Sequence, residues 1–179
     1  VYKRQQWSCS AQLFNKNTAT PNDKEALLVG GLQYGTATET NSSRLFIKNV
    51  NWPYLPGTLD EIKKLTPLFE NSGLHTQQIT GFDFTDSITN KLSNYSYIHF
   101  ATHGFYLDSQ QAVLNFNQEL NKEALAREPL FRSGLAISNA NNPNTKSSLH
   151  IPGHLLGYQI ANLDLKNAYL VTLSACETG

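Results

Sequence analysis

Two reactive side chains in this 179-residue chain each follow an apolar run rich in β-branched and aromatic residues. His103 follows residues 95–102, and Cys176 follows residues 168–175. Each run has the length and composition of a buried β-strand. Neighbouring parallel strands end at the same edge of a sheet, about 5 Å apart. We therefore expect the imidazole and the thiol to lie side by side, as in a Cys-His nucleophile pair.

The chemistry that fits such a pair is acyl transfer. His103 would take the proton of Cys176, because the thiolate is the nucleophile, and would later protonate the leaving amine. Gly104 has no Cβ, so a substrate carbonyl can approach its backbone closely, and the N–H groups of Gly104 and Cys176 would form an oxyanion hole. His99 lies on the same strand face as His103. It either orients the site or packs as an ordinary strand residue.

Each of these side chains also has a plainer interpretation. A free cysteine is most often a small buried hydrophobe, and a histidine after a strand is most often a hydrogen-bonded structural residue. A zinc site is a third interpretation, since His99 with His103 and His150 with His154 form two H-x3-H pairs. Strand residues four apart are separated by about 13 Å, and Pro-Gly interrupts the second pair. We therefore expect no metal and no cofactor.

Strands and helices alternate along the chain, which predicts an α/β fold with a mostly parallel central sheet and helices on both faces. The expected strands are residues 26–32, 75–80, 95–102, 130–138 and 168–175. The expected helices are residues 58–71, 85–93, 119–127 and 151–163. The expected loops are residues 34–51, with a small hairpin near 45–47, and residues 104–117 and 139–148.

The first expected helix has the clearest start signal. Thr58 and Glu61 match the S/T-x-x-E capping box, which predicts Thr58 as the N-cap. Apolar residues recur every three to four positions and form one face of this helix: Leu59, Ile62, Leu65 and Phe69. Pro67 lies inside the pattern and predicts a kink or an early end.

The composition indicates one globular domain that acts on neither nucleic acid nor membrane. Fourteen basic residues balance fourteen acidic ones, so no charge excess favours an anionic partner. No apolar run approaches the roughly 20 residues that span a bilayer, and no signal peptide is recognisable. With two cysteines, Cys9 and Cys176, a cytoplasmic location is expected. Residues 1–24 are interpreted as a linker or the tail of a preceding domain, and residues 25–179 as one domain of a longer protein.

Four motifs in order resemble the CHAT domain, over residues 26–179. They are residues 55–62 (LPGTLDEI), 99–105 (HFATHGF), 149–165 with its I-x-x-L-D-L ending, and 170–179 (LVTLSACETG). The resemblance implies a caspase-like fold, shared with separases, caspases and gingipains, and here incomplete at the C-terminus because the family continues past the cysteine motif.

By the same resemblance, His103 matches the family's general base, Cys176 its nucleophile and Gly104 an oxyanion-hole position. The implied function is that of a thiol protease cleaving a protein substrate in a bacterial signalling system. The implied partners are a tetratricopeptide-repeat domain or an activator protein, and the enzyme would be latent until activated. The alternative is a non-catalytic signalling or scaffold module that keeps the caspase-like fold.

Overall fold

The structure of the protein, a computed structural model, describes residues 25–36, 50–107, 128–142 and 153–175. Its strands are β1 (Glu25–Leu32), β2 (His75–Gly81), β3 (Tyr97–Ala101), β4 (Gly104–Tyr106), β5 (Ser133–Ala136), β6 (His154–Leu156) and β7 (Leu170–Ser174). Its helices are α1 (Pro56–Asn71), α2 (Asp86–Thr89), the 3-10 helix η3 (Leu92–Asn94), α4 (Pro129–Arg132) and α5 (Gly157–Ala161). The segment 1–24, the hairpin near 45–47 and the helix 119–127 lie outside the described residues.

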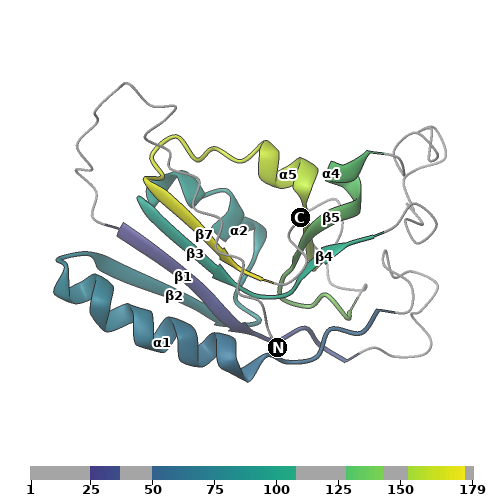
Figure 1. Ribbon diagram of the computed structural model, residues 1–179, viewed down its shortest axis with the longest axis horizontal. Coiled ribbons are helices and arrows are strands. Elements are labelled where there is room, and N and C mark those ends of the chain that lie inside the picture. The colour runs from purple at the N-terminus through teal and green to yellow at the C-terminus, as the bar shows by residue number, and fades with distance from the viewer. Residues whose placement is uncertain (1–24, 37–49, 108–127, 143–152, 176–179) are drawn as a thin grey trace.

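A four-stranded parallel sheet in the order β2-β1-β3-β7 forms the centre of the molecule (Figure 1). β1 pairs with β2 on one side and β3 on the other, and β3 pairs with β7. The side chains of β1 are buried from Ala26 to Leu32. Such burial on both faces is what a parallel sheet covered on two sides requires. The predicted α/β fold with a mostly parallel sheet is confirmed.

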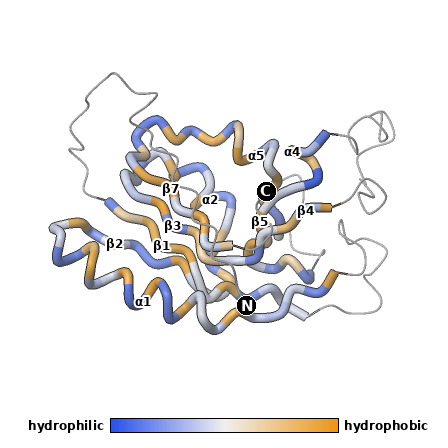
Figure 2. The backbone as a smooth tube through the Cα atoms, in the orientation of Figure 1, coloured by the Kyte–Doolittle hydropathy of each residue, from blue (hydrophilic) through white to orange (hydrophobic). Residues whose placement is uncertain are grey.

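Helices cover both faces of this sheet. Alternation along β1 sends Leu27 and Val29 to one face, where the core also takes in Ile88 of α2 and Ile160 of α5. Leu28 points to the other face and packs with Ile62 of α1. In Figure 2, hydrophobic positions are concentrated along β1, whereas hydrophilic and hydrophobic positions alternate along α1. The two faces therefore have separate cores.

Helix α1 begins one turn earlier than its capping motif predicts. Leu55 is the N-cap and Pro56 occupies the first helical position, where a missing N–H costs nothing. The Thr58 hydroxyl donates to the Leu55 carbonyl at 2.7 Å and accepts the N–H of Gly31 at 2.9 Å. The prediction of Thr58 as N-cap was wrong, because this buried hydroxyl links the first turn of α1 to the end of β1.

The proline inside α1 does not end the helix. Pro67 lies within the helix, which continues to Asn71. The chain then leaves through Gly73, whose φ of 78° belongs to the left-handed region that favours glycine. The expected early end was wrong. Packing of Ile62, Leu65 and Phe69 against the sheet holds the helix together past the lost backbone hydrogen bond.

A second sheet, antiparallel and in the order β4-β5-β6, lies beyond the end of β3 (Figure 1). The loop expected over residues 104–117 starts with β4, and the strand expected over 130–138 is helix α4 followed by β5. The helix expected over 151–163 contains β6 before α5. The three residues of β6 are all buried against β5, so pairing with β5 prevails over the local helical pattern.

The helix expected over 85–93 is reduced to α2 and η3. Within the described ranges, β2 and β7 are the two edge strands of the parallel sheet, and Leu170, Val171 and Leu173 of β7 are 36–41% exposed. Among the described residues, no helix is both long and apolar enough to cross a membrane.

Candidate active site at the ends of β3 and β7

The two strands that precede His103 and Cys176 are direct neighbours. Ala101 of β3 pairs with Ser174 of β7, and the N–H of Thr102 donates to the Ser174 carbonyl at 3.3 Å. His103 follows Ala101 by two residues, as Cys176 follows Ser174. Cys176 itself lies outside the described residues. The parallel neighbours expected from the sequence are therefore present up to Ser174, two residues before the cysteine.

The imidazole of His103 is oriented by a backbone carbonyl. Its Nε2 lies 2.8 Å from the carbonyl oxygen of Pro53. A carbonyl oxygen can only accept, so Nε2 carries the hydrogen. In the neutral ring the other nitrogen, Nδ1, then holds the lone pair and can take up a proton. The Pro53 carbonyl thus fixes the tautomer of His103.

Two aromatic rings flank the His103 ring. The Tyr34 ring lies 5.1 Å away between centroids and the Trp52 ring 5.2 Å away, both tilted. The Tyr34 hydroxyl lies 2.8 Å from Thr102 Oγ1, which donates to the Ala136 carbonyl at 2.6 Å. Because the single hydroxyl hydrogen of Thr102 is used in that bond, Tyr34 is the donor to Thr102. Burial raises the pKa of Tyr34 above its ordinary value of 10.0, so this hydroxyl stays protonated.

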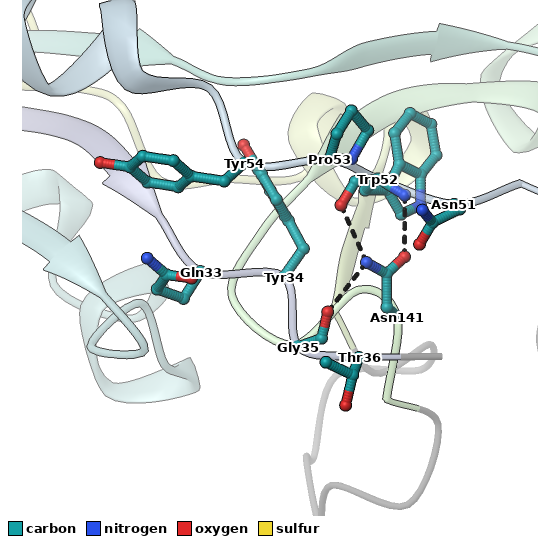
Figure 3. Close-up of a pocket in the computed structure, with 9 residues that line it drawn as sticks. All are labelled: Gln33, Tyr34, Gly35, Thr36, Asn51, Trp52, Pro53, Tyr54 and Asn141. Carbon is teal, nitrogen blue, oxygen red and sulfur yellow. Dashed lines mark hydrogen bonds between the residues drawn. The ribbon is translucent and has the colours of Figure 1, made fainter. Parts of the chain in front are cut away.

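Asn141 connects residues 34–35 to Trp52 (Figure 3). Its side chain accepts the N–H of Trp52 at 2.9 Å and donates to the carbonyls of Trp52 at 2.8 Å and of Gly35 at 3.1 Å. Its backbone N–H donates to the Tyr34 carbonyl at 2.7 Å. This buried amide therefore holds the residues on both sides of the histidine in one arrangement.

A hollow of about 400 Å³ opens beside these residues (Figure 3). It is lined by residues 33–36, residues 51–54 and Asn141, whose side chains carry no formal charge. Tyr54 is 40% exposed at its rim. The hollow shares Tyr34, Trp52 and Pro53 with the surroundings of the His103 ring.

The backbone N–H of Gly104 points away from the second sheet. Gly104 pairs with Leu135, and the adjacent ladder bond runs from the Ala136 N–H to the His103 carbonyl at 2.9 Å. Gly104 and Leu135 are thus a non-hydrogen-bonded pair, in which N–H groups point away from the partner strand. Gly104 directly follows the histidine, so its N–H can face a group bound there.

His99 belongs to a different cluster, on the α1 face of the sheet. Its Nε2 lies 3.0 Å from Glu61 Oε1, and the Ser174 hydroxyl donates to Glu61 Oε2 at 3.1 Å. Burial lowers the pKa of His99 below its ordinary value of 6.5, and the neighbouring Glu61 carboxylate opposes this shift. His99 is therefore a neutral ring near pH 7 that donates to Glu61. Within the described ranges, no three His, Cys, Asp or Glu side chains are placed to hold a metal ion.

The comparisons with known proteins decide the family. The family model described as the CHAT domain matches residues 5–179. The chain belongs to the CHAT domain family. A search of the curated proteins and a search of the solved structures each found no match. CHAT domains are caspase-like and broadly resemble cysteine peptidases, and they generally accompany other domains such as tetratricopeptide repeats.

The CHAT motifs located His103, Gly104 and the strand before Cys176, but not the groups around the histidine. The Pro53 carbonyl, Tyr34, Trp52 and Asn141 were all missed. A backbone carbonyl leaves no trace in the sequence, and Asn141 lies in a polar segment where nothing distinguishes it from its neighbours. The only available signal was the Trp-Pro dipeptide just before the helix motif. The role in orienting the site expected for His99 stays a prediction.

Proposed function

We propose that this CHAT domain is a cysteine endopeptidase that cleaves a protein substrate with His103 as general base and Cys176 as nucleophile. The observation that carries the proposal is the parallel pairing of Ala101 with Ser174. If this register continued for two residues, Cys176 would lie beside His103. The Pro53 carbonyl leaves Nδ1 of His103 as the proton acceptor, which is the atom that would take the thiol proton.

The catalytic steps follow from these groups. The Cys176 thiolate attacks the scissile carbonyl carbon, and the developing oxyanion is met by the N–H groups of Gly104 and Cys176. Protonated His103 gives its proton to the leaving amine as the C–N bond breaks, which leaves a thioester. Water then adds to the thioester with His103 again as base, and the thiol and a carboxylic acid are released. The uncharged hollow beside His103 supplies a surface for the substrate chain.

The partners and context implied by the family complete the proposal. A tetratricopeptide-repeat domain or an activator protein would switch the enzyme on in a bacterial, cytoplasmic signalling system. The orientation of His103 by a backbone carbonyl is already present in the described residues, so activation would act on the side of the substrate or of Cys176.

The test is the alkylation rate of Cys176 by iodoacetamide as a function of pH, followed by mass spectrometry with Cys9 as an internal reference. We expect rapid labelling well below the free-thiol pKa of about 8.5, and we expect His103→Ala to abolish it. His75→Ala is the control, because His75 is exposed at the start of β2. Slow labelling at Cys176 that is indifferent to His103 would instead favour the non-catalytic scaffold.

A further inference from the structure

The carboxylate of Glu61 joins the two strands that lead to the candidate dyad. It accepts the Nε2–H of His99 from β3 at 3.0 Å and the hydroxyl of Ser174 from β7 at 3.1 Å. Glu61 itself comes from α1, which packs on that face of the sheet. One side chain therefore ties three elements together at the end of the sheet where His103 and Cys176 follow.

The setting favours these two hydrogen bonds. The His99 side chain is 9% exposed and that of Glu61 35% exposed, so the contact lies at the border of the core. Hydrogen bonds to an ionised carboxylate are roughly twice as strong as neutral ones. The neutral state of His99 suits this arrangement, since a neutral ring needs no full counter-charge and still donates from Nε2.

The end of β7 is where such a tie can act on the candidate nucleophile. Its last paired residue, Ser174, lies beside Ala101 of β3, and its carbonyl accepts the N–H of Thr102 at 3.3 Å. Ser174 is its last residue and lies two positions before Cys176. A reacting atom misplaced by 1 Å can cost a factor of about 100 in rate. The position of Ser174 thus sets where the nucleophile enters the site.

We propose that Glu61 is a positioning residue, which holds the Cys176-bearing end of β7 in place against β3 through Ser174 and His99. The inference rests on the proposed function, because it assigns Glu61 a role in the reactivity of Cys176. In a purely structural role, Glu61 would affect the stability of the fold but not the rate at which the thiol of the folded protein reacts. The positioning role predicts a change in that rate.

The experiment measures Cys176 alkylation in the full chain below the free-thiol pKa, at a temperature where circular dichroism shows each variant to be folded. Glu61→Ala is expected to slow the reaction about tenfold, equivalent to about 1.4 kcal/mol in activation free energy. Glu61→Gln is expected to keep most of the wild-type rate, because its amide can accept from Ser174 and donate to the other tautomer of His99. Glu70→Ala is the matched control, since Glu70 lies on the same helix and accepts from Thr76.

A second pair of variants keeps the test valid if Glu61→Ala fails to fold. Ser174→Ala removes only the β7 contact and is expected to slow alkylation, whereas Thr172→Val, on the same face of β7, is expected to leave it unchanged. Folded Glu61→Ala and Ser174→Ala proteins that react at the wild-type rate would overturn the positioning role alone, provided that His103→Ala is slow. A wild-type thiol that is slow and indifferent to His103 would overturn both this role and the proposed peptidase.

Discussion

The buried hydroxyl chain beside His103 allows a quantitative test of its direction. Tyr34 donates to Thr102, and Thr102 donates to the Ala136 carbonyl. Tyr34 and Thr102 are each 2% exposed, so water cannot replace a lost partner without a rearrangement. The perturbation is a double-mutant cycle with Tyr34→Phe, Thr102→Val and the double variant, all of which keep the shape of the side chains.

The direction of the chain makes the two single changes unequal. Thr102→Val leaves the Tyr34 O–H without an acceptor and removes a donor from Ala136, and we expect it to cost about 3 kcal/mol of unfolding free energy. Tyr34→Phe leaves the bond from Thr102 to Ala136 intact but removes the acceptor of the backbone N–H of His103, so about 2 kcal/mol is expected. The double variant contains no stranded phenol and should lose only about 3 kcal/mol, which gives a coupling energy of about 2 kcal/mol.

Urea denaturation followed by far-UV circular dichroism provides the unfolding free energies of all four proteins. The assay needs the denaturant slope to be equal among them, so that the differences are differences in stability. A Tyr34→Phe variant that is less stable than Thr102→Val would refute the assigned direction. Losses that simply add in the double variant would refute the hydrogen-bonded chain itself.

Three further predictions concern residues around the site. Asn141→Ala strands the N–H of Trp52 and should cost about 2–4 kcal/mol in urea denaturation; an unchanged midpoint would contradict the linking role of this amide. Gly153→Ala should cost more than about 3 kcal/mol, because φ is 75° there and a Cβ would lie 2.3 Å from Ala140 Cα; a thermal melt near that of the wild type would count against this geometry. The folded state binds fewer protons at His99 than the unfolded state, since its pKa is lowered from 6.5. The contribution of His99 to stability should therefore be full above pH 6.5 and be lost as the pH drops through the lowered pKa. The His99→Asn variant should show a flatter dependence of stability on pH. An equal slope in both proteins would argue against this role of His99.

The central sheet could be predicted from the sequence because local and long-range forces agree there. The runs that became β1, β3 and β7 are short and mostly apolar, which is typical of buried parallel strands. The segment after β3 was harder, because β6 contains only His154, Leu155 and Leu156 and lies within a stretch of helical character. Its strand conformation depends on pairing with β5, which local sequence patterns do not encode.

The residues of the candidate site likewise comprise some that the sequence indicates and others that only the fold brings together. The motifs indicated His103 and Cys176 as candidates because acyl-transfer chemistry needs such side chains at strand ends, and their catalytic roles stay a proposal. The contact of His103 with Pro53 joins residues 50 positions apart through a main-chain atom, so no side-chain pattern could reveal it. Glu61 was recognised only as part of a capping box, whereas in the fold its carboxylate points to His99 and Ser174. A helix motif can thus have a tertiary role that its local interpretation conceals.

The pairing of β3 with β7 has a consequence for how this chain tolerates change over evolution. The chain leaves β3 at Ala101 and returns to pair beside it at Leu170, so residues 102–169 form one long connection between neighbouring strands, which includes the second sheet. Doubling the length of a flexible loop costs only about 0.6 kcal/mol, so insertions and deletions are tolerated where this connection is a loop between its strands and helices. A slip of β7 by a single residue is not, because it would turn Ser174 to the opposite face of the sheet, away from Glu61. Relatives should therefore differ widely in the length of the connection that corresponds to residues 102–169. They should keep constant the number of residues between the serine equivalent to Ser174 and the cysteine.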